Sequence, residues 1–357
     1  MSSTDVHGLW TVAPRCTLRC CDTAEVAAPR PETATGYRVG GGDGGRFDPS
    51  VLYAAAKLYY LQDATQAEVA ARLGTSRATV SRLLSEARRQ GIVKISVIAP
   101  ETVGSDGLAE QLAAVLGLDS VEISAPVPVS SSGPADVMGS VLAPAVGKAL
   151  RAVGLDPGDI LLVSSGRTVY EVSRFELPQL PGVVVAPTVG GTDQPEAWYQ
   201  TNEISRRVAE RVGGRAMYLF APALPGPELY ETLLLDPTIQ RVLHLWPQAR
   251  CVLTGVGAPP LLRAQAPQFI DTSSTALVEA VGDICSRFFS RTGAPVTFPG
   301  SERLIALDLE TLKQIPVVIA VASGADKVVP LIAGARAGFF DHLVTDPQTA
   351  RMVLDRA

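Results

Sequence analysis

Apolar residues first recur three and four positions apart near residue 50, which is the spacing of one face of an α-helix. This pattern predicts three helices, over residues 50–61, 66–73 and 76–90, followed by a short strand over 91–98. The side chains expected to face inward are Val51, Leu52, Ala55, Leu58, Tyr59, Val69, Ala70, Leu73, Val80, Leu83, Leu84 and Ala87. The sequence therefore predicts a small helical domain here.

The residues at the ends of these helices indicate the same boundaries. Thr65 and Glu68 form a T-x-x-E capping box at the start of the second helix. Gly74 ends that helix, because glycine tolerates the positive φ common at a helix C-terminus. Ser76 is predicted to be the N-cap of the third helix.

Beyond Pro100 the pattern changes to short apolar runs that alternate with helical stretches. The predicted strands are 159–164, 183–189, 215–221, 250–254, 303–308 and 316–322, and the predicted helices are 107–116, 135–152, 202–212, 228–234, 275–289 and 326–336. Near-continuous apolar strands between helices are typical of a parallel sheet covered on both faces. The predicted fold class is α/β, with an all-α head and a doubly wound, mostly parallel α/β domain.

These changes of pattern divide the 357-residue chain into three parts. Residues 1–46 are rich in Pro, Gly and Thr and lack periodic apolar positions, so we expect a disordered tail. The tail is equally compatible with a start codon upstream of the true one. Residues 47–98 form the predicted helical head, and residues 99–357 form the predicted α/β domain.

Composition excludes several classes of protein. No apolar run approaches the roughly 18 residues of a membrane span, and the first ten residues lack a secretory signal. We therefore expect no membrane partner and a cytoplasmic location. Cys251 and Cys285 lie in apolar stretches and are expected to be buried thiols. The group Cys16, Cys20 and Cys21 lacks a second ligand pair at zinc-finger spacing, so neither a metal nor a cofactor is predicted.

Charge is distributed unevenly between the two predicted domains. Residues 47–98 carry seven basic and four acidic side chains, whereas residues 99–357 carry 19 basic and 27 acidic ones. A basic module joined to a larger acidic one suits a DNA-binding head on a body that binds something else.

The segment 66–85 has the spacing of a helix-turn-helix. Two helices that cross at a tight turn need a small residue where their backbones touch, and Ala70 supplies it. They also need a glycine in the turn and a branched apolar residue on the second helix that packs against the first, and these are Gly74 and Val80. The residues expected to meet DNA are Gln66, Ser76, Arg77, Thr79, Ser81 and Arg82. Arginine can bind guanine edges and hydroxyls can reach phosphates or bases. An ordinary helical hairpin is the alternative, which the basic outer face disfavours.

One such module makes few contacts with DNA. We therefore expect a homodimer or homotetramer that binds two half-sites of double-stranded operator DNA.

The run YYLQDATQAEVAARLGTSRATVSRLLSEARRQGIVKISV resembles the SorC family of bacterial transcriptional regulators, which join a helix-turn-helix to a sugar-binding domain. The resemblance continues through SSGRTVYEV, VGG, LTGVG, VGDICSRFF, IPVVIAVASGADKV and LVTD in the family's order. It covers about residues 47–357, and the combination of motifs is far more specific than any one of them.

Several candidate effector loops follow the predicted strands. Ser165, Gly166, Arg167 and Thr168 form a loop between a strand and a helix, which suits either a phosphate cradle or a plain tight turn. Further glycine turns at strand ends contain Gly190, Gly191, Gly255, Gly257 and Gly324. Ligands of open α/β sheets bind beyond the carboxyl ends of the strands, where these loops would converge.

Several polar and charged residues are also candidates for binding the effector at this edge of the sheet. Lys327 is placed to meet an anion, or else it is a surface lysine. Asp283 either accepts sugar hydroxyls or caps a helix, and Gln200 and Asn202 could also bind hydroxyls. Arg263 and Arg287 are weaker candidates, expected in salt bridges or at the surface.

The resemblance implies more than the residues show by themselves. SorC-type bodies are similar to phosphosugar isomerases and bind phosphorylated sugars, and members are usually tetramers or dimers. The family's effector loops match here at Ser165–Thr168, at Gly190 and Gly191, and at Asp283 and Lys327. Two features depart from the family pattern, namely the tail and the positive charge of Arg167.

The preferred hypothesis is a DNA-binding regulator controlled by a phosphorylated sugar or polyol, with no catalytic residues. The alternative is a sugar-phosphate isomerase or deaminase with an appended head. That chemistry needs a positioned general base. His244 and His342 lie in apolar contexts, and Asp193, Asp283 and Asp326 lack an evident acid partner, so the sequence disfavours the enzyme.

Overall fold

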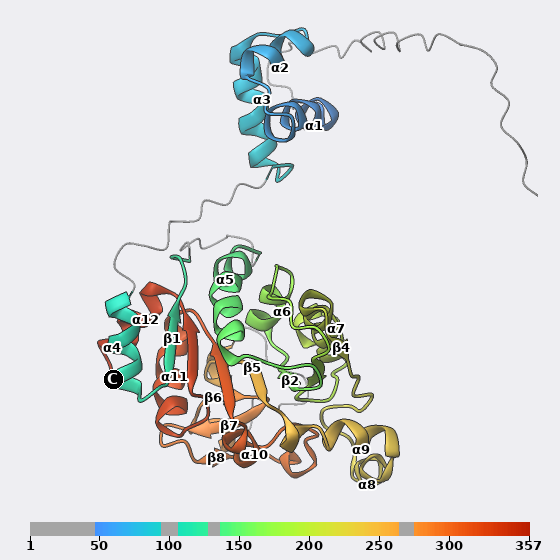
Figure 1. The fold of residues 1–357 in the computed structure, drawn as a ribbon, viewed down its shortest axis with the longest axis vertical. Coiled ribbons are helices and arrows are strands. Elements are labelled where there is room, and N and C mark those ends of the chain that lie inside the picture. The colour runs from blue at the N-terminus through green and yellow to red at the C-terminus, as the bar shows by residue number, and fades with distance from the viewer. Residues whose placement is uncertain (1–46, 94–105, 128–135, 264–274) are drawn as a thin grey trace, which may run out of the picture. The chain divides into compact units, whose positions relative to one another are not determined.

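The computed structural model describes residues 47–93, 106–127, 136–263 and 275–357 (Figure 1). Its internal contacts divide the chain into two units, Met1–Ile95 and Ser96–Ala357. The predicted tail, 1–46, lies outside the described residues.

The first unit is helical. It contains α1 (Pro49–Ala56), the π-helical turn η1 (Lys57–Leu61), α2 (Gln66–Arg72) and α3 (Arg77–Arg89). The capping box of Thr65 and Glu68 is present, and Ser76 accepts a hydrogen bond from the backbone N–H of Thr79, so both predicted caps are confirmed. The predicted strand is not supported, because residues 91–93 form a turn and a bend, and 94–98 lie outside the described residues.

The turn between α2 and α3 has the predicted geometry. Gly74 has φ +60°, and the N–H of Thr75 donates to the carbonyl oxygen of Ala70 at 2.9 Å. This bond closes a Schellman motif, in which a left-handed residue ends the helix and satisfies one of its free carbonyls. Leu73, Val80 and Leu83 are buried in the core beside this turn.

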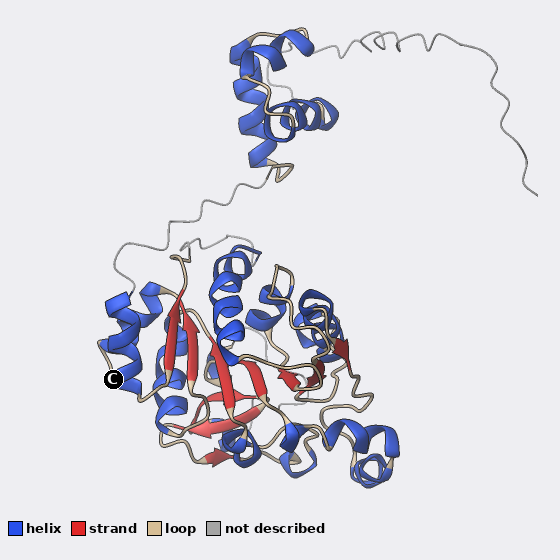
Figure 2. Cartoon of the chain, viewed as in Figure 1, coloured by secondary structure: helices blue, strands red, loops and turns tan. Residues whose placement is uncertain are grey.

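The second unit is built on a seven-stranded sheet in the order β1-β10-β9-β5-β2-β3-β4 (Figure 2). Every pair of neighbouring strands in it is parallel. The strands are β1 (Ser120–Ile123), β2 (Ile160–Val163), β3 (Val184–Pro187), β4 (Arg215–Ala216), β5 (Cys251–Gly255), β9 (Val317–Val321) and β10 (His342–Thr345).

Helices cover both faces of this sheet, so the predicted doubly wound α/β fold is confirmed. Successive residues of a strand point to opposite faces. Accordingly Leu161 and Val163 of β2 belong to one apolar core, whereas Ile160 and Leu162 belong to the other. The first core is covered by α5 (Asp136–Val153), α6 (Arg167–Ser173) and α7 (Thr201–Val212). The second is covered by α4 (Asp106–Leu116), α9 (Pro237–Leu243), α10 (Leu309–Gln314), α11 (Val328–Arg336) and α12 (Pro347–Leu354).

The remaining helix, α8 (Pro227–Leu235), precedes α9. Short 3-10 turns are η2 (Ala197–Tyr199), η3 (Trp246–Gln248), η4 (Pro260–Leu262), η5 (Thr275–Leu277), η6 (Ser301–Arg303) and η7 (Ala325–Lys327). None of the helices in the described ranges is long and apolar enough to cross a membrane.

The predicted helix over 275–289 is wrong. This segment contains β6 (Ala280–Ile284) and β7 (Arg287–Ser290), which form an antiparallel sheet with β8 (Pro295–Val296). The side chains of β6 alternate between buried and half-buried, which is the period of a strand. Cys285 and Ser286, both at positive φ, reverse the chain between the two strands.

Two predicted strands also need correction. Residues 303–308 are not part of a sheet, because their backbone bonds to two separate loops: Ile305 N–H donates to Ala223 and Leu307 N–H to Thr188, each at 2.8 Å. The strand predicted over 215–221 ends at Ala216. The sequence pattern missed β1 and β10, which lie together at one edge of the sheet.

Helices α5 and α6 meet at Gly139, where a Cβ would lie 2.4 Å from the carbonyl oxygen of Glu171. We predict that Gly139→Ala lowers the free energy of unfolding by about 1–3 kcal/mol, because the backbones must separate. Gly147→Ala is the matched control in the same helix, where the nearest atom would lie 3.6 Å away. It should be neutral or stabilising by up to about 1 kcal/mol. Denaturant unfolding of both variants checks the pair, and an unaffected Gly139→Ala variant would contradict this packing.

Candidate functional site

The direction of the chain reverses within the sheet at the boundary between β2 and β5. After β2 the chain moves to β3 and β4 on one side, whereas after β5 it moves to β9 and β10 on the other. The loops that follow β2 and β5 therefore diverge over the carboxyl edge of the sheet. Ligands of open α/β sheets bind at such a divergence.

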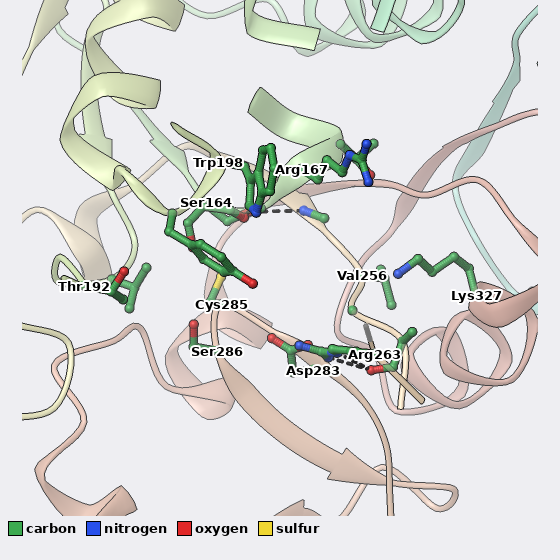
Figure 3. Close-up of a pocket in the computed structure, with 18 of the residues that line it drawn as sticks. Ser164, Arg167, Thr192, Trp198, Val256, Arg263, Asp283, Cys285, Ser286 and Lys327 are labelled. Carbon is green, nitrogen blue, oxygen red and sulfur yellow. Dashed lines mark hydrogen bonds and ion pairs between the residues drawn. The ribbon is translucent and has the colours of Figure 1, made fainter. Parts of the chain in front are cut away.

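A cavity of about 340 Å³ lies at this edge (Figure 3). Its volume is within the range of small-molecule sites. The lining comes from the loops after β2, β3, β5 and β9, from the turn between β6 and β7, and from η2. The polar and aromatic lining residues include Ser164, Ser165, Arg167, Thr168, Thr192, Trp198, Tyr199, Arg263, Asp283, Cys285, Ser286, Asp326 and Lys327.

Ser164 joins the two diverging loops. Its side chain is buried at the end of β2. The Oγ atom accepts a hydrogen bond from the N–H of Gly255 at 3.1 Å and donates to the carbonyl oxygen of Ser165 at 2.9 Å. These bonds fix the loop after β2 against the end of β5, so the floor of the cavity is preorganised.

The loop after β2 leads directly into α6. Gly166, at φ +121°, is the N-cap and has no side chain to bond the first amides of the helix, which also lack intrahelical partners. Its own N–H donates to the carbonyl oxygen of Trp198 at 2.9 Å. The guanidinium carbon of Arg167 lies 5.4 Å from the centre of the Trp198 ring, a cation–π arrangement that holds the arginine at the cavity wall.

Asp283 does not cap a helix, and its carboxylate is engaged in an ion pair at the cavity wall. It lies in β6 and forms an ion pair with Arg263, and each side chain is only 15% exposed. Arg263 also donates from Nε to the carbonyl oxygen of Ala258 at 2.8 Å. Gly257 leaves room for this pair, because a Cβ there would overlap the carboxylate of Asp283 and displace it. The predicted salt bridge of Arg263 is thus confirmed.

Lys327 ends η7 and lines the cavity with a side chain that is only 18% exposed, so it is not a surface lysine. Burial lowers the pKa of its ammonium group, and Asp326 opposes this shift with an ion pair of 3.4 Å between Nζ and Oδ2. A buried ammonium beside a partly exposed carboxylate would gain from a second anion in the cavity.

The structure brings together most of the predicted effector residues. Those that line the cavity are Ser165, Gly166, Arg167, Thr168, Gly190, Gly255, Asp283 and Lys327. Three do not line it. The N–H of Gly191 donates to Ala221, at 2.8 Å; the side chain of Gln200 donates to the carbonyl oxygen of Gln194; and Asn202 exchanges two hydrogen bonds with the backbone of Leu219.

Sequence reasoning missed Thr192, Trp198, Tyr199, Cys285 and Ser286 as lining residues. Trp198 and Tyr199 follow β3 in a segment without glycine turns or periodicity. Cys285 and Ser286 were missed because the segment 275–289 was predicted to be a helix. Arg287, a weak candidate, is away from the cavity and donates to the carbonyl oxygens of Ser301, Leu304 and Ala306.

In the helix-turn-helix, Arg77, Ser81 and Arg82 are exposed on α3. Ser76 uses its hydroxyl as the N-cap, at 2.9 Å from the hydroxyl of the half-buried Thr79. Gln66, the first residue of α2, is also half-buried. Within the described ranges Arg77, Ser81 and Arg82 form no side-chain hydrogen bond or ion pair, so their polar groups face solvent.

The predicted burial of two cysteines is confirmed, since Cys251 and Cys285 are buried free thiols. Burial raises the pKa of the Cys285 thiol to about 11, so it stays protonated near neutral pH. Across the described ranges no group of three or more His, Cys, Asp or Glu side chains could hold a metal ion. Cys16, Cys20 and Cys21 lie outside these ranges.

Comparison with known proteins identifies both units. Residues 101–355 match the family described as "Putative sugar-binding domain", and residues 57–90 match "Sigma-70, region 4". The chain is 28% identical to the sorbitol operon regulator of Klebsiella pneumoniae over 86% of this chain and 98% of that protein. It is 30% identical to the deoxyribonucleoside regulator of Bacillus subtilis, over 84% of this chain and 96% of that protein.

Comparison with solved structures finds regulators of the same kind. The full-length sorbitol operon regulator SorC from Klebsiella pneumoniae aligns with a TM-score of 0.61 over 85% of this chain and 98% of that chain, at 28% identity. A DeoR family transcriptional regulator from Listeria monocytogenes aligns with a TM-score of 0.60 over 69% of this chain and 98% of that chain, at 25% identity. The chain therefore belongs to the SorC family, as a sugar-responsive DNA-binding regulator of transcription.

Proposed function

We propose that the cavity binds a phosphorylated sugar or polyol, and that the bound effector changes the affinity of the helix-turn-helix for operator DNA. The observation that carries the proposal is the charge of the cavity wall. Among the lining residues that the structure describes, three cations, Arg167, Arg263 and Lys327, stand against two carboxylates, Asp283 and Asp326. Each carboxylate is already paired with one of these cations, so this described lining has an excess of positive charge that suits a phosphate.

The aromatic and hydroxyl-bearing residues of the lining are suited to binding the sugar part of the effector. Trp198 and Tyr199 offer flat apolar faces, which carbohydrates can cover with their C–H groups, and serine and threonine hydroxyls can both donate and accept hydrogen bonds. We expect Arg167 and Lys327 to bind the phosphate, with Ser165 and Thr168 beside them. The positive charge of Arg167, which departs from the family pattern, then adds to the phosphate site.

Regulation requires two states of the protein that the effector binds unequally. A single helix-turn-helix buries too little surface for tight operator binding. We therefore propose that the protein acts on DNA as a homodimer or homotetramer whose arrangement of heads depends on the effector. Because its target is chromosomal DNA, we place this activity in the cytoplasm.

We propose further that the protein is not an enzyme. Isomerisation of a sugar phosphate needs a carboxylate or histidine free to move a proton. Among the described residues no histidine lines the cavity, and the two aspartates that do line it are held in ion pairs. We predict no turnover of sugar phosphates in a coupled assay with purified protein. Isomerisation that is lost on Asp283→Asn would contradict this prediction.

For DNA binding we predict that replacing both Arg77 and Arg82 by alanine weakens operator binding by about 100-fold or more, because each base contact is worth about 1–3 kcal/mol. The melting temperature should stay nearly unchanged, since both side chains are exposed. Arg241→Ala with Arg351→Ala removes the same charge from exposed sites in the other unit and should leave binding intact. Equal affinities of the two double variants in a gel-shift titration would refute the placing of the recognition helix.

For the effector we predict that a sugar phosphate at about 100 times its Kd raises the melting temperature by about 5 °C or more. Lys327→Met should abolish most of this shift, because it removes a cation at the proposed phosphate site. Lys148→Met, which removes an ammonium that is 69% exposed and pairs with Glu122, should retain it. A full shift in the Lys327→Met protein would exclude Lys327 from binding.

A further inference from the structure

The turn between β6 and β7 has a conformation that its residues do not favour. It is a two-residue hairpin loop in which Cys285 has φ +51° and Ser286 has φ +64°. Loops with positive φ at both positions usually contain glycine, asparagine or aspartate, because a Cβ crowds the backbone there. The described residues include only one other non-glycine residue at positive φ, Asp63 in the helical unit.

Packing in the structure explains the positive φ of Cys285. The thiol of Cys285 is buried against the hydroxyl of Thr254, at 3.7 Å between Sγ and Oγ1. Ser286 makes no such contact: it is half-buried, it lines the cavity, and its hydroxyl has no hydrogen-bond partner within the described ranges. Strained residues persist where the surroundings require them, and such residues cluster at ligand sites.

A second hydroxyl without a partner lies on the same side of the cavity. Thr192 follows β3, lines the cavity and has a buried Oγ1 with no hydrogen-bond partner among the residues described. Figure 3 shows Thr192 and Ser286 on the side of the cavity away from Lys327. A neutral hydroxyl both donates and accepts hydrogen bonds, so it matches a sugar hydroxyl better than a phosphate.

We propose that Ser286 is a specificity-determining residue, whose hydroxyl binds a hydroxyl group of the effector at the end remote from the phosphate. The left-handed turn aims this side chain into the cavity, and Thr192 supplies a second hydroxyl nearby. The inference rests on the proposed function, because it assumes that the cavity holds a polyhydroxylated effector. It adds which part of the effector this side of the cavity recognises.

Two substitutions of Ser286 distinguish the effect of its hydroxyl group from the effect of its strained backbone. Ser286→Ala removes the hydroxyl and keeps the strained backbone, whereas Ser286→Gly removes both. We expect each to weaken effector binding by about 3- to 10-fold, the loss of one hydrogen bond. Only Ser286→Gly should raise the melting temperature of the unliganded protein, by about 2–4 °C. Asp63→Gly is the matched control, because it relieves the same kind of strain outside the cavity and should leave effector affinity unchanged.

The probe is chosen with the full-length wild-type protein from a panel of pentose 5-phosphates, hexose 6-phosphates, hexitol 6-phosphates and their unphosphorylated forms. Calorimetric titration then uses the compound that shifts the wild-type melting temperature most. Wild-type affinity in the Ser286→Ala protein would overturn the role of Ser286 while leaving the proposed function intact. If only unphosphorylated compounds bind, the phosphate site is refuted and Ser286 is still tested with the best of them. A panel in which nothing binds the wild type would overturn both.

Discussion

The structure depends on the point where the connections of a parallel sheet diverge. Because β2 continues to one side and β5 to the other, the loops that follow these two strands diverge over their carboxyl ends. Ser164 holds the two loops together with one hydroxyl group. The apolar strands beneath are buried on both faces, so a shift of one residue would exchange the side chains that pack into the two cores. The cavity is therefore a consequence of the order of strands. Its polar lining residues are held in place by the buried sheet beneath them.

The helix-turn-helix depends on local interactions instead. Its boundaries are fixed by a capping box, a left-handed glycine and a serine N-cap, all within 12 residues of one another. Such signals are visible in sequence because each involves neighbours along the chain. For this reason the predicted helices agree closely with α2 and α3, and the predicted inward-facing residues of these helices are buried. The strand predicted over 91–98 had no comparable local signal; residues 91–93 form a turn and a bend, and 94–98 lie outside the described residues.

The candidate site could be predicted only in part. Residues in glycine-rich loops after apolar strands, such as Ser165 and Gly255, were found because parallel topology places those loops at one edge. Gln200 and Asn202 were expected at the site but do not line the cavity, since their amides bond to backbone groups that are close only in three dimensions. The segment 275–289 looked helical because its apolar residues are closely spaced, yet a two-residue reversal at positive φ makes it a hairpin. That error concealed Ser286, and the ion pair of Asp283 with Arg263 joins residues 20 positions apart.

Control of operator binding by an effector requires that the cavity and the helix-turn-helix be thermodynamically coupled. Coupling between two ligands is reciprocal, so the factor by which an effector changes the operator Kd must equal the factor by which operator DNA changes the effector Kd. The direct measurement is calorimetric titration of the full-length protein with a sugar phosphate, in the absence and presence of saturating operator DNA. We expect the two effector affinities to differ by about 5- to 150-fold, the usual range of allosteric coupling. Identical affinities, with effector bound in both titrations, would show that the two sites are not coupled.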